Sequence, residues 1–192
     1  MKFINLNKTK QHNLAFDTEG EIYVVFFHNL SGKLDFEINS SNVDLYIFGL
    51  FTGKNKDNFQ IETIQRHNAP NSRSDLLIKG VFDDNSKFIY QGLIRLEKSA
   101  QQSHAYQKNQ NLILSKGVFV DSRPFLEILA NDVFCTHGST TGKLNQDQIL
   151  YSQTRGLDKE TAEKMLVQGF IDEIYLKLGQ IMPGADFSSY NN

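Results

Sequence analysis

The sequence contains a single cysteine, Cys135, no tryptophan and only 3 prolines among its 192 residues. One cysteine excludes a disulfide within the chain and any metal site built from several of its own thiolates. The scarcity of proline excludes a proline-rich linker. Long hydrophobic runs are also missing, because the strongest extends only from Ile22 to Phe27 and is too short to cross a bilayer.

Neither sign of charge dominates, since 20 Lys and Arg stand against 22 Asp and Glu for a net charge of −2. This balance lacks the basic surface that nucleic acids and acidic membranes attract. The first residues also lack the continuous apolar stretch of a signal peptide. We therefore expect a cytoplasmic protein that binds neither nucleic acid nor membrane, with the length of one domain.

The first 130 residues contain short apolar or alternating runs that are bounded by turn-forming clusters such as 29–32, 52–55 and 83–86. Period-two alternation and β-branched or aromatic content favour strands over helices. No helix is expected before about residue 140. The strands are predicted at 22–27, 34–38, 45–51, 59–64, 76–82, 88–96, 112–120 and 125–130.

A short internal repeat adds to this pattern. The segment Lys79-Gly80-Val81-Phe82 recurs as Lys116-Gly117-Val118-Phe119, 37 positions later, and apolar runs flank both copies. Two copies of one unit indicate stacked β-coils, each of which buries its apolar face on the next. The repeat alone leaves open a sandwich or barrel with two similar hairpins.

After Gly142 the pattern becomes helical. Asn145 can cap a short helix that Gly156 ends, and Asp158 can cap a second helix that Gly179 ends. The predicted organisation is therefore a β body over 1–142, a C-terminal helical subdomain over 143–179 and a loose tail over 180–192.

Cys135 and His137 are the first candidates for chemistry, because alternate residues of a strand point to the same face. A thiolate and an imidazole there could bind a metal or form a nucleophile–base pair. Two ligands do not complete a metal site, so a second subunit would have to supply the others. The alternative interpretation is a small buried hydrophobe beside a hydrogen-bonded histidine.

His67, His104 and His137 provide another hypothesis, in which three histidines of a β-scaffold form the metal centre of a small enzyme. Their spacing matches no compact ligand motif. The residues themselves favour the other interpretation, in which each histidine is a solvated or hydrogen-bonded strand residue.

Taken together, segments from about residue 60 to 178 resemble the SufB/SufD family of iron–sulfur cluster assembly proteins. The resemblance is densest where the strand around Cys135 follows a long apolar run. It is carried, in family order, by His67-Asn68-Ala69-Pro70, Lys79-Gly80-Val81, Tyr90-Gln91-Gly92, the segment 107–115, the segment 124–140, Thr154-Arg155-Gly156-Leu157 and Gly169-Phe170.

The resemblance implies a mainly β fold, namely a right-handed parallel β-helix of stacked coils followed by a small helical subdomain. It also implies a SufD-like, non-catalytic subunit that pairs with a SufB-like scaffold through the β-helix. The C-terminal helices would dock a SufC-like ATPase, with the docking surface at Leu150, Met165, Leu166, Phe170 and Ile174.

The same resemblance places Cys135 and His137 near the paired-subunit interface, where they would be iron or cluster ligands only together with a partner chain. The Cys-x-His-Gly form at 135–138 is similar to SufD. We accordingly expect no cofactor bound stably by the isolated chain, and a transient iron or iron–sulfur cluster at the interface.

The chain departs from the family in length, because family members usually have an N-terminal helical region and more β-coils. It also has no second cysteine for a scaffold role. It is therefore expected to be either a minimal SufD-like partner or a shortened paralogue. A further alternative is a homodimer that pairs through its β-helix, has lost the ATPase partner and serves as an interaction module.

Overall fold

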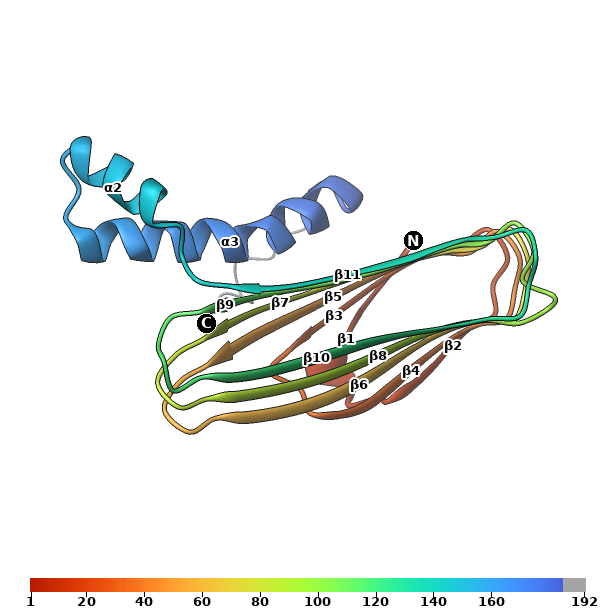
Figure 1. Cartoon of the computed structure of the whole chain (residues 1–192). Coiled ribbons are helices and arrows are strands. Elements are labelled where there is room, and N and C mark those ends of the chain that lie inside the picture. Colours follow the sequence, from red (N-terminus) through yellow and green to blue (C-terminus); the bar gives the residue numbers. More distant parts are fainter. Residues whose placement is uncertain (185–192) are drawn as a thin grey trace.

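The computed structural model describes residues 1–184, which form a parallel β-helix with a helical hairpin along one side (Figure 1). The chain alternates between two sheets whose paired strands all run parallel. Sheet A contains β1 (Lys2–Asn5), β3 (Ile22–His28), β5 (Asp44–Gly53), β7 (Arg73–Phe82), β9 (His104–Ile113) and β11 (Phe134–Gly142). Sheet B contains β2 (Asn13–Phe16), β4 (Gly32–Ile38), β6 (Asn58–His67), β8 (Lys87–Leu96) and β10 (Phe119–Ile128). The prediction of a mainly β fold of stacked coils is confirmed.

The register of the sheets gives the true length of a coil. Asp44 pairs with Arg73, 29 positions later, and Arg73 pairs with His104 after a further 31. The 37-residue repeat in the sequence is therefore not the structural repeat. Residues 79–82 end β7, whereas residues 116–118 lie in the turn before β10.

The interior between the two sheets is built mainly from phenylalanine. Phe51 on β5 is fully buried, and its ring centroid lies 4.7 Å from that of Phe88 on β8. Phe82 stacks on Phe88 at 4.9 Å. Each such ring stabilises the fold by about 2–3 kcal/mol through removal of apolar surface from water. Alternation predicts these strands well because every second residue points into this core.

The corners of the coils depend on residues that tolerate a left-handed backbone. Asn42, Asn71 and Gln102 lie two positions before β5, β7 and β9 and have φ angles of 60°, 55° and 57°. Asparagine adopts this conformation more easily than most side chains because it hydrogen-bonds to the nearby backbone. The asparagine-rich corners therefore let each coil turn at the same place as the one before it.

The two ends of the β-helix differ. At the N-terminal end, the one-turn helix α1 (Leu6–Thr9) places Leu6 over the interior, where it is 1% exposed. This helix lies before residue 140, where none was expected. At the other end, β10 and β11 each have one edge without a strand partner among residues 1–184.

The helical hairpin consists of α2 (Gln146–Thr154) and α3 (Lys159–Ile181), with the caps that the sequence predicts. Oδ1 of Asn145 accepts from the Asp147 amide at 2.8 Å, and Oδ1 of Asp158 accepts from the Thr161 amide at 2.8 Å. Helix α3 ends at Ile181, two residues beyond the predicted end. Of the predicted loose tail, residues 185–192 lie outside the described residues.

The second half of α3 packs on the outer face of sheet A (Figure 1). Ile174 and Leu178 are buried there against five apolar side chains that point outward from the sheet: Val24, Phe26, Phe48, Leu50 and Leu77. Among residues 1–184, no helix is long and apolar enough to span a bilayer.

One predicted strand is wrong. The run 112–120 is divided between the end of β9, a turn and the start of β10. Most of β9 was missed because its inward residues are polar, and Gln107, Asn109 and Asn111 give no hydrophobic alternation.

Candidate functional site

The last strand of sheet A carries the candidate site at the open end of the β-helix. Cys135 and His137 pair with Ala105 and Gln107 of β9, both of which are buried in the coil interior. The two side chains therefore lie on the inward face, as the alternation predicts. His137 is nevertheless exposed, because no further described coil covers the inner row of β11.

Strand β10 supplies the facing side of this open end. Oγ of Ser139 on β11 donates to Oγ of Ser122 on β10 at 2.9 Å, so the inner rows of the two strands face each other. Leu126 and Ile128, which continue the inner row of β10, are 37% and 42% exposed. The open end thus combines the serine pair, Cys135 and His137 with the apolar Leu126 and Ile128, beside two backbone edges that no strand among residues 1–184 pairs with. Such an edge is a template for strand pairing with another chain.

Cys135 is half-buried among apolar neighbours that include Leu96 and Ala105. This burial raises the pKa of the thiol to about 11. At neutral pH the side chain is therefore a protonated thiol, which is a weak nucleophile and a poor metal ligand. A change in its surroundings would be needed to form the thiolate.

Beneath the open end, the interior contains a layer of buried polar side chains. Nε2 of His67 lies 2.7 Å from Oγ of Ser74, to which Nε2 of Gln65 donates at 2.8 Å. Burial lowers the pKa of His67 to about 4, so the ring is neutral at pH 7. Within residues 1–184, Oε1 of Gln65, Oε1 of Gln107 and Nδ1 of His67 have no hydrogen-bond partner.

The three histidines of the metal-enzyme hypothesis lie apart. His67 points into the interior from β6, and His137 belongs to the inner row of β11. His104 is exposed on the opposite face of sheet A, where its ring lies 5.8 Å from that of Phe134. Over the described part of the chain, no three His, Cys, Asp or Glu residues form a group that could hold a metal ion. The structure therefore does not bring His67, His104 and His137 together into one metal centre.

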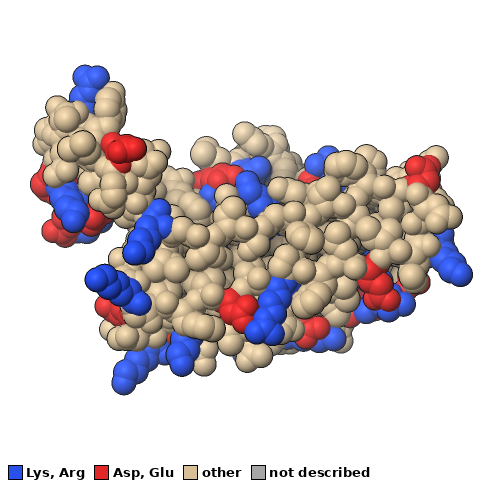
Figure 2. All heavy atoms as spheres, in the orientation of Figure 1, with Lys and Arg blue, Asp and Glu red and all other residues tan. Residues whose placement is uncertain are grey.

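The predicted docking residues divide into accessible and buried ones. Leu150 and Met165 are 61% and 50% exposed on the hairpin, which projects beyond the strand ends at one side of the β body (Figure 2). Leu166 and Phe170 are half-buried. Ile174 is fully buried, because it belongs to the contact between α3 and sheet A and not to a free surface.

Sequence reasoning missed Lys79, which lies on the outer face of β7 beneath α3 and is 1% exposed. Its Nζ donates to the Phe170 carbonyl at 2.8 Å, lies 4.0 Å from the centroid of the Phe170 ring and forms an ion pair with Glu173. Burial lowers the pKa of Lys79, although Glu173 acts in the opposite direction. The sequence feature that could have indicated this buried charge is a lysine within an otherwise apolar run.

The sequence of this chain is similar to those of known proteins. The family model described as "SUF system FeS cluster assembly, SufBD core domain" matches residues 25–170. The iron-sulfur cluster assembly protein SufD of Escherichia coli is 30% identical over 83% of this chain and 40% of its own length. SufD of Bacillus subtilis is 30% identical over 66% of this chain and 28% of its own length. A SufBD family protein of Synechocystis is 33% identical over 56% of the chain and 24% of its own length. The chain thus spans less than half the length of these relatives.

Proposed function

This chain belongs to the SufBD family of the SUF system, and we propose that it acts as a SufD-like, non-catalytic subunit in iron–sulfur cluster assembly. In this proposal it pairs with a SufB-like scaffold through the open end of the β-helix and docks a SufC-like ATPase on the hairpin. The observation that carries the proposal is the open end itself, where β10 and β11 each have one edge without a strand partner among the described residues and β11 carries Cys135 and His137.

The open end suits a partner with its own strand edge. Strands β10 and β11 are 10 and 9 residues long, and their free edges would continue both sheets into a second chain. Pairing would also cover apolar side chains such as Leu126 and Ile128, and removal of that surface from water favours association. Cys135 and His137 would then be enclosed at the interface.

In this proposal the iron or cluster is cargo that two chains hold together. Protein-bound clusters use several thiolates, and this chain has one cysteine whose pKa is raised to about 11 by burial. A partner would have to supply further ligands, and metal binding would remove the thiol proton. The isolated chain is therefore expected to retain no cluster.

The hairpin provides the second proposed interface. Leu150, Tyr151 and Met165 are exposed apolar or aromatic side chains on the hairpin, which projects from the body of the molecule (Figure 2). An amphipathic helical hairpin of this kind can dock into a hydrophobic groove of a partner. Tyr151 extends the docking surface expected from the sequence.

Pairing can be tested with one charged substitution at each of two places. Leu126→Lys puts a charge on the inner row at the open end, and Ile22→Lys makes the same kind of change at an exposed apolar residue of β3. Co-purification with the SufB-like protein of the same organism should be lost only with Leu126→Lys. Equal binding of the SufB-like protein by both variants would exclude the open end as the pairing surface. A stable dimer of the chain alone in size-exclusion chromatography would instead favour the homodimer.

ATPase docking can be tested in the same way on the hairpin. Met165→Glu and Leu150→Glu should abolish co-purification with the SufC-like ATPase. Leu176→Glu, at a 66% exposed leucine of the second half of α3, should not. Retention of the ATPase by the two hairpin variants would contradict the docking proposal.

The ligand role can be tested in the reconstituted complex under anaerobic loading with iron and sulfide. We expect His137→Ala to lower the cluster absorbance of the complex without altering its assembly. The matched variant Ser139→Ala lies on the same inner row and should leave loading unchanged. Unchanged loading with His137→Ala would remove this residue from the mechanism.

A further inference from the structure

Helix α3 consists of two halves that are held very differently. Its second half lies against sheet A, where Ile174 and Leu178 are buried. Its first half extends beyond the sheet and contacts α2, and Ala162 on this half is buried, as are Ile149 and Ser152 on α2. Other side chains of this half are exposed, such as Lys164 at 75%.

The fixed half begins at a single strong attachment. Lys79, buried under the helix, contacts the Phe170 ring and donates to the Phe170 carbonyl at 2.8 Å. It also forms an ion pair with Glu173, one turn further along. A buried ammonium with several partners is costly to separate from them, because an unpaired buried charge is destabilising. Lys79 therefore holds α3 at Phe170.

Gly169 directly precedes this attachment. A Cβ at this position would meet no atom within 4 Å, so no close packing requires glycine there. Glycine in the middle of a 23-residue helix lowers its local stability by about 1 kcal/mol relative to alanine. Gly169 thus puts a position of low helix propensity at the junction between the free and the fixed half of α3.

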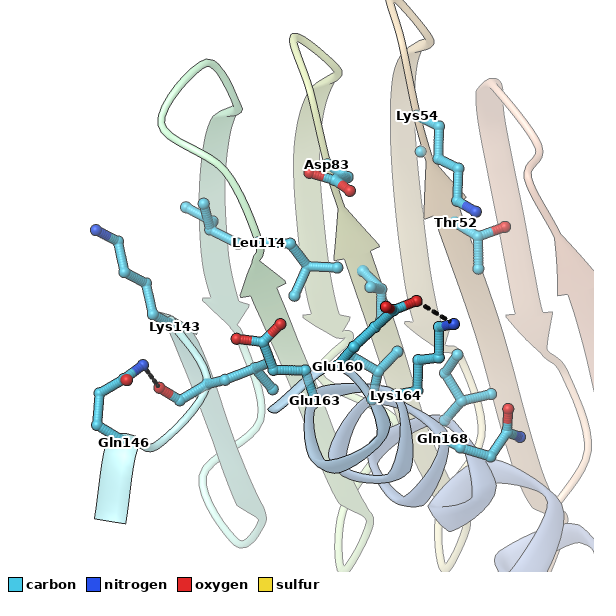
Figure 3. A pocket seen from close by; sticks show the side chains of 16 residues that line it. Thr52, Lys54, Asp83, Leu114, Lys143, Gln146, Glu160, Glu163, Lys164 and Gln168 are labelled. Atoms are coloured by element: carbon cyan, nitrogen blue, oxygen red, sulfur yellow. Dashed lines mark hydrogen bonds and ion pairs between the residues drawn. The ribbon is translucent and has the colours of Figure 1, made fainter. Parts of the chain in front are cut away.

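A cleft of about 830 Å³ separates the free half from the ends of β5, β7 and β9 (Figure 3). Glu160 and Glu163 point from α3 toward the strand ends. The charged groups of α3 that line the cleft are Glu160, Glu163 and Lys164, and on the helix Glu160 pairs with Lys164 and Glu163 with Lys159. The strand ends contribute Lys54 and Asp83, and Lys143 lies on the connection after β11.

We propose that α3 bends at Gly169, so that α2 and the first half of α3 move as one unit and close the cleft, while Lys79 keeps the second half on sheet A. The moving unit is joined to β11 by residues 143–145 alone, and Lys143 and Leu144 line the cleft. Closure therefore reaches the connection that follows the strand of Cys135 and His137. This inference stands independently of the proposed partners.

The motion can be measured by pulsed electron paramagnetic resonance on the full chain in a Cys135→Ser background. Spin labels at Lys56→Cys, in the turn after β5, and Lys159→Cys, at the start of α3, should report an open and a closed distance. Gly169→Ala should lower the ratio of closed to open molecules about five-fold, the factor that about 1 kcal/mol of helix propensity represents. A single narrow distance in the parent protein would overturn the hinge.

Gly179→Ala is the matched control, because Gly179 lies in the fixed half of α3 and also has no atom near a Cβ. It should leave the ratio unchanged. Equal effects of the two alanine variants would overturn the assignment to Gly169.

A second label pair, Lys56→Cys with Leu176→Cys, tests the attachment. It should give one narrow distance in the parent protein and a broader one with Lys79→Met. Two distances from this pair in the parent protein would show that the whole helix moves, and that result would also exclude the hinge.

Discussion

The two ends of the β-helix differ in how the interior of the last coil is covered. At the N-terminal end, α1 covers the coil interior and Leu6 is buried over the phenylalanine core. At the C-terminal end, His137 on the inner row of β11 is exposed, and β10 and β11 each have one edge that no strand among residues 1–184 pairs with. The terminal coils of stacked-coil proteins are capped, and in the proposed function a second chain covers this end.

The side chains of the interior also differ between the first and the last coils. The inner row of β5 is apolar, whereas the inner row of β9 is mostly polar and contains Gln107, Asn109 and Asn111. Buried polar atoms without partners cost about 1–3 kcal/mol each. Asn109 and Asn111 hydrogen-bond to each other, whereas Oε1 of Gln107 has no partner among the described residues, so we expect the coil of β9 to contribute less stability than that of β5.

The largest expected effect is at the closed end. Leu6→Ala should lower the free energy of unfolding by about 2–5 kcal/mol, because it leaves a cavity over the core. Urea unfolding followed by circular dichroism measures this change. Leu176→Ala, at an exposed leucine, should stay within about 0.5 kcal/mol of the parent protein. A loss below 1 kcal/mol with Leu6→Ala would show that α1 does not cap the core.

The polar layer should make stability depend on pH. Burial lowers the pKa of His67 from 6.5 to about 4, so the unfolded chain takes up the proton first as the pH falls. Stability should therefore decrease below pH 6.5, by roughly 2 kcal/mol at pH 5. The comparison is between the parent protein and His67→Gln, each unfolded in urea at pH 7 and pH 5. The same decrease in both proteins would exclude His67 as its source.

The smallest effect is expected at the open end. Leu126→Ala removes the same atoms as Leu6→Ala, but Leu126 is 37% exposed, so the isolated chain should lose only about 1 kcal/mol. The matched pair of substitutions tests the difference between the ends directly. An equal decrease in the free energy of unfolding for Leu6→Ala and Leu126→Ala would mean that the open end is already covered in solution. A larger loss in the presence of the SufB-like partner would place the partner on this end.

Sequence patterns predicted the strands whose buried side chains are apolar and the helices that begin at a capping residue. Strands β3, β4, β5, β7 and β8 were predicted within a few residues, because apolar residues alternate along them or fill them. The helix starts at Asn145 and Asp158 were predicted because capping is local chemistry. Strand β9 was missed because its inner face is polar. The 37-residue repeat did not match the coil length, because its two similar sequences lie at the end of a strand and in a turn.

The candidate site shows the same division. That Cys135 and His137 share a face follows from strand periodicity alone. That His137 is exposed at an open end, that His104 lies on the opposite face of sheet A and that Ile174 is buried against sheet A are consequences of stacking. Periodicity describes which residues share a side of an element, but it does not say what covers that side.

The sequence by itself determined the periodicities, the caps and the corners of this protein, since each depends on residues that are neighbours along the chain. Only the tertiary structure decided which lysine is buried, which end is closed and which coil has a polar interior. These properties depend on pairs such as Lys79 with Glu173 and His137 with Gln107, which are separated by 30 to 94 positions. Burial and charge pairing act through space, so they become defined only when the coils stack and α3 packs on sheet A.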